Sequence, residues 1–189
     1  LVDRDGTIVW SECVADELPN YLPETTDIAW LTLTKWIGPL VRGRSFDRPQ
    51  DAHALLDYHI RGHQMAKAAV EMGLWELSAQ KQNVSLSRLL GGTRGRVPTG
   101  VSIGIQPNPA ALVEKADTCQ SQGYRKIKLK IRPGADIEFV SAVREKLGPV
   151  THLMVDANNA YTMQDAGVLR QLDELNLMMI EQPLAWDDY

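Results

Sequence analysis

Three segments combine charged side chains with the apolar runs that form buried β-strands. The first, KIKLK, carries Lys126, Lys128 and Lys130, and the other two end at Asp156 and Glu181. Since side chains alternate between the two faces of a strand, the three lysines lie on one face. Lys130, Asp156 and Glu181 follow one another at intervals of about 25 residues, the length of one strand–helix repeat. This spacing predicts that an ammonium group and two carboxylates meet at one edge of a parallel sheet.

These residue types suit proton transfer assisted by a metal ion. Carboxylate oxygens from separate strands are typical ligands of a hard divalent cation such as Mg²⁺. Asp156 and Glu181 end very apolar strands, where an unpaired charge would be costly. A nearby cation disfavours the ammonium form of a lysine, so that one lysine can act as a neutral base near pH 7. Taken singly, each of these charged residues is explained as well by an ordinary solvated strand end. The functional interpretation rests on their equivalent positions in successive repeats.

The residues after 96 alternate between strand-like and helix-like patterns. This alternation predicts parallel strands with helical crossovers, in either a (β/α)₈ barrel or a doubly wound sheet. No GxGxxG or GxxxxGK[ST] motif follows a predicted strand, which disfavours a nucleotide-binding doubly wound fold. The expected strands are 97–105, 126–131, 152–156 and 177–181, and the expected helices are 107–122, 136–147 and 162–175.

The first half of the chain is predicted to be mostly helical. Apolar residues recur at helical spacing over 28–40, 51–60 and 64–82, with one short turn over 87–90. The basic, loop-like sequence Arg94-Gly95-Arg96 separates the two halves, so we expect one domain over 1–95 and another over 96–189.

Composition narrows the classes of protein and partner. The chain has 189 residues, of which 44% are hydrophobic and 23% charged, as in ordinary globular domains. A formal net charge of −4 gives no bulk attraction to nucleic acid or anionic lipid, and no apolar run approaches the ~20 residues of a membrane span. Cys13 and Cys119 form no CxxC motif. We therefore expect a cytoplasmic protein without nucleic-acid or membrane partners.

Several segments, taken together, resemble the enolase superfamily and its muconate-lactonizing subgroup. Within that subgroup, the chain resembles most the o-succinylbenzoate synthase/N-acylamino acid racemase family. The resemblance spans nearly the whole chain. The matching segments are VPTGVSIGI from Val97, IKLKIRPG from Ile127, VDANNAY from Val155 and IEQPL from Ile180, with ECVA from Glu12, MAKAA from Met65 and LLGG from Leu89.

This resemblance implies a fold and a set of catalytic groups. The fold is α/β: an incomplete N-terminal α+β capping domain, then the first four strands of a (β/α)₈ barrel, with the chain truncated at both ends. Lys130 resembles the acid/base lysine of a KxK pair, and Lys128 the partner that steadies the anion. Lys126 offers a second KxK register, but the following Ile-x-Pro-Gly favours the later pair. Asp156 and Glu181 resemble two of three Mg²⁺ ligands.

The resemblance also assigns three substrate-binding residues. Asn158 corresponds to an asparagine that lines the site beside the first metal ligand, and Ser102 to a substrate contact on the first barrel strand. Tyr21 corresponds to an aromatic residue of a mobile loop in the capping domain. Three positions depart from the family pattern: Val9 and Ser11 stand in place of glycines, and Asp16 in place of an apolar residue. These departures bear on substrate specificity.

The activity implied is that of a carbon–oxygen lyase in menaquinone biosynthesis. Lysine removes a proton α to a carboxylate, Mg²⁺ stabilises the resulting enediolate, and loss of hydroxide completes an o-succinylbenzoate synthase-type dehydration. The same half-site serves an N-acylamino acid racemase, and a third reading is an inactive fragment that acts only as an assembly unit. The expected partner is a small-molecule carboxylate, with a homo-oligomer at full length. These residues alone are expected to bind Mg²⁺ weakly and to catalyse poorly.

Overall fold

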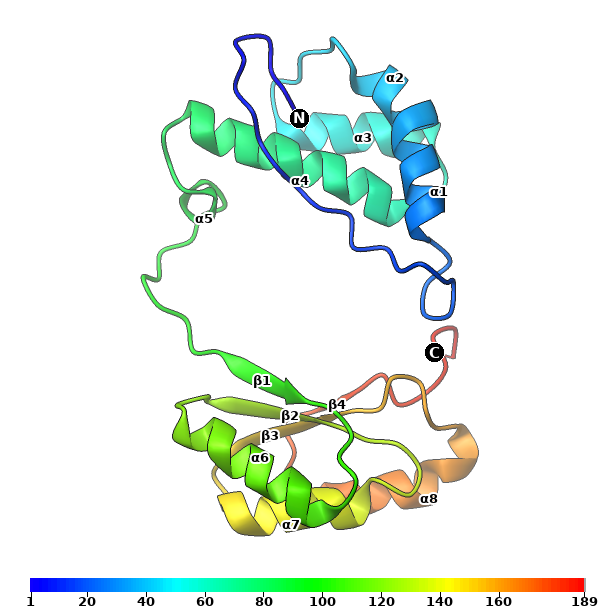
Figure 1. Ribbon diagram of the computed structural model, residues 1–189, viewed down its shortest axis with the longest axis vertical. Helices are drawn as coiled ribbons and strands as arrows, with labels where there is room; N and C mark the ends of the chain where they lie inside the picture. Colours follow the sequence, from blue (N-terminus) through cyan, green and yellow to red (C-terminus); the bar gives the residue numbers. More distant parts are fainter. Residues whose placement is uncertain (189) are drawn as a thin grey trace. The chain divides into compact units, whose positions relative to one another are not determined.

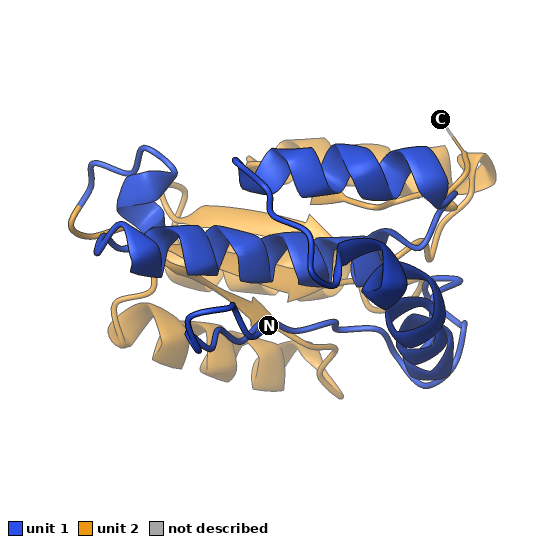
Figure 2. Cartoon of the chain, turned by 90° about the horizontal axis from the view of Figure 1, so that it is seen from above, with its two compact units in different colours: residues 1–94 blue, residues 95–189 orange. Residues whose placement is uncertain are grey.

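The computed structural model describes residues 1–188, and the chain divides into two compact units (Figures 1 and 2). Unit 1 is Leu1–Arg94 and unit 2 is Gly95–Tyr189. Across the described residues, none of the helices combines the length and apolarity needed to cross a bilayer.

Unit 1 begins with one helical stretch where the sequence predicts a helix over 28–40. It comprises α1 (Thr26–Leu31), a π-helical segment η1 (Thr32–Ile37) and α2 (Gly38–Val41). Thr25 caps its start by accepting a hydrogen bond from the backbone N–H of Ile28 at 3.3 Å. The sequence does not predict the wider π turn. It precedes Pro39, which cannot donate to the helix and whose ring would press on a carbonyl one regular turn earlier.

The other helices of unit 1 are α3 (Pro49–His59), α4 (Gln64–Lys81) and α5 (Leu86–Leu89), which confirms the predicted helices over 51–60, 64–82 and 87–90. In the described part of unit 1, β-structure is limited to the isolated bridges Val2↔Ile8 and Asp16↔Thr25. The apolar core joins η1, α3, α4 and the residue that follows α3, through Ile37, Leu56, Ile60, Ala66 and Val70.

Unit 2 contains a parallel sheet. Over the described residues it has four strands in the order β1-β2-β3-β4, so each strand pairs with the next one in sequence. The strands are β1 (Gly100–Ile103), β2 (Lys126–Lys130), β3 (His152–Asp156) and β4 (Ile180–Glu181). β2 and β3 agree with the prediction, whereas β1 and β4 are shorter than expected.

Helices connect these strands. The first two are α6 (Pro109–Ser121), capped by Asn108, and α7 (Ile137–Leu147), capped by Asp136. The third predicted helix, over 162–175, is mostly 3₁₀: η2 (Met163–Asp165), α8 (Ala166–Leu169) and η3 (Arg170–Leu175). Leu169, Leu172 and Leu175 all pack on the core of unit 2. Their spacing of three matches a 3₁₀ turn, which places all three on one side.

The two faces of the sheet differ in character. Helices α6, α7 and α8 lie on one side of it (Figure 1). Alternate residues on this side, such as Ile127, Leu129 and Val155, are fully buried against the helices. The intervening residues point to the opposite face, and these include the lysines of β2 and the acid that ends β3. The alternation in KIKLK therefore divides one strand between a core and a candidate site.

Candidate active site

The strand register brings the predicted ionisable groups to one level. Lys130 pairs with Asp156, and Asp156 pairs with Glu181 on the next strand. This confirms the expectation that one βα repeat separates equivalent positions. Lys126 lies at the other end of β2, paired with Gly100 and His152. The lysines that reach the acids are therefore those of the later KxK register.

Asp156 is the centre of the cluster. Its side chain is 1% exposed. Its Oδ2 accepts hydrogen bonds from Lys130 Nζ at 2.7 Å and pairs with Lys128 Nζ at 3.1 Å, while Oδ1 accepts the backbone N–H of Asn158 at 3.0 Å. Burial alone would raise the pKa of Asp156, but the bonds from Lys130, Lys128 and Asn158 outweigh it and hold that pKa below its ordinary value.

Lys128 bridges the two acids. Its Nζ donates to Glu181 Oε1 at 3.3 Å and to Oε2 at 3.1 Å, in addition to its contact with Asp156. The hydrogen bonds with Glu181 and then Asp156 raise the pKa of Lys128 above its ordinary value. This lysine is therefore an ammonium ion that bridges both carboxylates, and Lys130 supplies the second positive charge of the cluster.

Asn158 completes the contacts of Lys130. Lys130 Nζ donates to Asn158 Oδ1 as well as to Asp156. Asn158 and Asn159 both have positive φ, 43° and 65°, at the sharp turn that follows β3. Asparagine tolerates this left-handed conformation better than most residues, which explains two successive asparagines directly after the strand.

The donor set fits a divalent cation in part. Asp156 and Glu181 converge closely enough that one ammonium group lies within 3.1 Å of an oxygen from each. Two carboxylates that already share one positive charge offer the hard oxygen ligands that Mg²⁺ prefers. Within residues 1–188, no group of three or more His, Cys, Asp or Glu side chains could hold a metal. These two acids therefore supply only part of a coordination shell.

Two further predicted residues, Ser102 and Tyr21, belong to different units of the chain. Ser102 is exposed on β1 and pairs with Lys128, so it occupies the neighbouring strand at the next level of the site face. Tyr21 belongs to unit 1, where it is 49% exposed in the segment before α1. The substrate-binding roles of Ser102, Asn158 and Tyr21 remain predictions.

Sequence reasoning missed two residues of this region. Met154 is 3% exposed and pairs with Lys128, and the alternation of β3 places it on the face of Asp156. Gln182 follows Glu181 and accepts a hydrogen bond from Asn158 Nδ2 at 3.3 Å. The period-two pattern could have indicated Met154. Only the fold places Gln182 beside Asn158.

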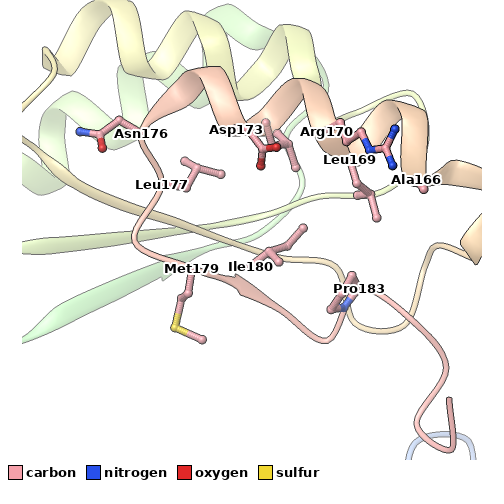
Figure 3. A pocket seen from close by; sticks show the side chains of 10 residues that line it. Ala166, Leu169, Arg170, Asp173, Asn176, Leu177, Met179, Ile180 and Pro183 are labelled. Carbon is pink, nitrogen blue, oxygen red and sulfur yellow. The ribbon is translucent and has the colours of Figure 1, made fainter. Parts of the chain in front are cut away.

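A hollow of about 520 Å³ lies elsewhere in unit 2 (Figure 3). Leu169 and Arg170 line it from the helical side, and Ile180 and Pro183 from β4 and the residues after it. The charged cluster contributes no residue to it. Because Ile180 and Glu181 are successive strand residues, their side chains point to opposite faces of β4. The hollow is therefore distinct from the candidate active site.

Comparisons with known proteins identify the family of this chain. Residues 11–91 match the mandelate racemase/muconate lactonizing enzyme N-terminal domain, and residues 111–189 match the enolase C-terminal domain-like family. An o-succinylbenzoate synthase of Geobacillus stearothermophilus is 44% identical over 188 residues, which is 100% of this chain and 50% of that protein. An N-succinylamino acid racemase of Thermus thermophilus is 42% identical over 177 residues, or 94% of this chain and 47% of that protein.

A solved structure of an enolase superfamily member from Listeria innocua superposes with a TM-score of 0.95 at 38% identity, covering 99% of this chain and 50% of that one. The chain belongs to the enolase superfamily. It spans about half the length of the relatives that it matches. The predicted α/β fold, an N-terminal cap followed by part of the barrel, is confirmed.

Proposed function

We propose that this chain carries the proton-abstracting half of a Mg²⁺-dependent o-succinylbenzoate synthase-type active site. The observation that carries the proposal is the convergence of Lys130 and Lys128 on Asp156, with Glu181 at the same level. The 44% identity to an o-succinylbenzoate synthase supports this choice of reaction. The enzyme would be a carbon–oxygen lyase, with the menaquinone pathway as the proposed setting.

Each residue has a distinct part in the proposed chemistry. Asp156 and Glu181 would hold Mg²⁺, whose charge would offset the negative charge that builds on a substrate carboxylate. Lys130, which lies beside Asn158, would take the proton next to that carboxylate in its neutral amine form. Lys128 would keep a positive charge beside the anion. With Asp156 and Glu181 engaged by a divalent ion, the lysines would no longer be needed to neutralise them.

An N-succinylamino acid racemase is the second candidate for the reaction. The observation that favours it is the 42% identity to such an enzyme from Thermus thermophilus, close to the identity with the synthase. Both reactions begin with removal of a proton α to a carboxylate, so Lys130 and the two acids serve either one. A third proposal, from another class, is an inactive unit that only assembles with a partner.

The deciding assay compares both substrates in the native gene product that carries this chain. We expect dehydration of the cyclohexadiene substrate of o-succinylbenzoate synthase and its loss by about 10²–10⁴-fold in Lys130→Ala. Lys126→Ala is the matched control, because Lys126 lies on the same strand at the end away from the acids. Racemisation of N-succinylamino acids without dehydration would select the second candidate. Equal activity in both lysine variants would refute the role of Lys130.

The remaining expectations about partners and location are also proposals. The substrate is a small-molecule carboxylate, because the site combines a cation-binding pair of acids with two lysines on one face. A cytoplasmic location and a homo-oligomer at full length complete the proposal, and size-exclusion chromatography with light scattering tests the latter.

A further inference from the structure

The residue after Glu181 adopts an uncommon backbone conformation. Gln182 has a φ of 45°, in the left-handed region that residues other than glycine and asparagine seldom adopt. The backbone N–H of Asn159, itself left-handed, donates to the carbonyl of Gln182 at 2.8 Å. This bond joins the turns that follow β3 and β4, and Gln182 is the residue strained there. Strain of this kind concentrates where the surrounding structure needs a particular side-chain placement.

The side chain of Gln182 orients the amide of Asn158. Asn158 Nδ2 donates to Gln182 Oε1 at 3.3 Å, while Asn158 Oδ1 accepts from Lys130. The two ends of an amide differ, because the nitrogen only donates and the oxygen only accepts. With its nitrogen engaged by Gln182, the amide presents its oxygen to Lys130. A flipped amide would oppose N–H donors to the ammonium group and would lose both bonds.

Lys130 is consequently held from two directions. Asp156 Oδ2 lies 2.7 Å from its Nζ, and Asn158 Oδ1 is the second acceptor. The bond to Asp156 fixes a distance, and the bond to Asn158 selects the direction of the ammonium group. A group that transfers a proton must lie within hydrogen-bond reach of its target, so a small displacement has a large effect on rate.

We propose that Gln182 is a positioning residue for Lys130 and acts through the Asn158 amide. The proposal rests on the proposed function for the role given to Lys130. The relay itself, Gln182–Asn158–Lys130, is a feature of the fold and can be tested without catalysis.

The test uses nuclear magnetic resonance of the isotope-labelled chain at constant pH. Gln182→Met keeps the side-chain length and removes its polar end, so we expect shifts in the Asn158 side-chain amide signal and in the Lys130 Cε–Hε signal. Gln182→Glu retains an acceptor oxygen and should return the Asn158 amide signal toward that of the wild type. Gln164→Met, at an exposed glutamine in η2, is the matched control and should leave both signals in place.

An Asn158→Ala background separates the relay from general loosening. There, Gln182→Met should leave the Lys130 signal where Asn158→Ala alone has put it. The proposal is overturned if Gln182→Met shifts the Lys130 signal as much in the Asn158→Ala background as in the wild type. It is also overturned if Gln182→Met alone leaves the Lys130 signal unchanged. If Gln182→Met does not fold, Gln182→Gly, which suits a positive φ, carries the same test. The Lys130→Ala assay tests the proposed function separately, so either result can fail without the other.

Discussion

Among residues 1–188, each unit buries one charged side chain, and the two units do so in opposite ways. In unit 1, Lys67 on α4 is 1% exposed and pairs with Asp57 on α3 at 2.9 Å, with the Asp57 side chain 56% exposed. In unit 2 the buried partner is Asp156, and the lysines are 24% and 29% exposed. In unit 1 a single ion pair links α3 and α4. In unit 2 two lysines and a second acid surround Asp156.

This difference separates a structural ion pair from a candidate site. In the Lys67–Asp57 pair, removal of Asp57 would leave a buried ammonium group without its carboxylate partner. The cluster around Asp156 holds two lysines and a second acid, all partly open to solvent. Under the proposed function, a divalent ion would take the place of an ammonium group beside these acids. The following predictions test that contrast.

The largest effect on stability is expected in unit 1. Lys67→Ala removes the pair and leaves a cavity, and should lower the free energy of unfolding of unit 1 by about 3 kcal/mol. Lys67→Met keeps the buried length without the charge and should cost about 1 kcal/mol or less. Four of the five tryptophans, Trp10, Trp30, Trp36 and Trp75, lie in unit 1, so urea unfolding followed by tryptophan fluorescence reports mainly on this unit. The exposed Lys35 provides the control, Lys35→Ala, and equal losses in both alanine variants would contradict the assignment.

In unit 2 the same kind of change should affect ion binding more than stability. Asp156→Asn keeps the shape but removes the charge, and should weaken Mg²⁺ binding at least about 100-fold. Its cost in unfolding free energy should be about 1 kcal/mol, since the partly exposed lysines can turn to solvent. Calorimetric titration of the native gene product measures the first effect and urea unfolding the second. Asp173→Asn, at an exposed acid in η3, is the control, and equal Mg²⁺ affinity in both variants would refute the metal site.

The smallest effect is a pH dependence of unit 2. The pKa of Asp156 is lowered on folding, so its contribution is complete above the ordinary value of about 3.9 and is lost as pH falls through the lower folded pKa. The pKa of Lys128 is raised, so its contribution is complete below about pH 10.4 and is lost as pH rises through the higher folded pKa. The stability difference between wild type and Asp156→Asn should therefore be greatest near neutral pH. Urea unfolding over this range checks it, and a difference independent of pH would contradict the described ion pairs.

Much of the fold was predictable because its signals are local. Alternation of apolar and charged residues set the phase of β2, and Gly123 and Gly148, with φ of 94° and 81°, end the helices before β2 and β3 as expected. The π turn before Pro39 and the 3₁₀ character of 163–175 were not predicted. The π turn depends on how the helix accommodates Pro39. The 3₁₀ turns depend on how leucines spaced three residues apart pack against the core of unit 2.

The candidate site was predictable only in part. Regular spacing was enough to align Lys130, Asp156 and Glu181, since parallel strands in one register repeat at equal intervals. Spacing could not indicate that Lys128 bridges both acids, because that contact joins residues 53 positions apart and depends on where long side chains turn. It also could not distinguish the buried Lys67 from an exposed helical lysine.

The sequence alone determined which side chains share a face and in which order the strands carry them, because both follow from the period of a strand and the length of a βα repeat. The tertiary structure decided which ammonium group meets which carboxylate, that Asp156 is buried, and that Gln182 reaches Asn158. Those contacts depend on how neighbouring strands pack and on the turn that contains Gln182. Each contact joins residues that are far apart along the chain, so local sequence patterns do not encode it.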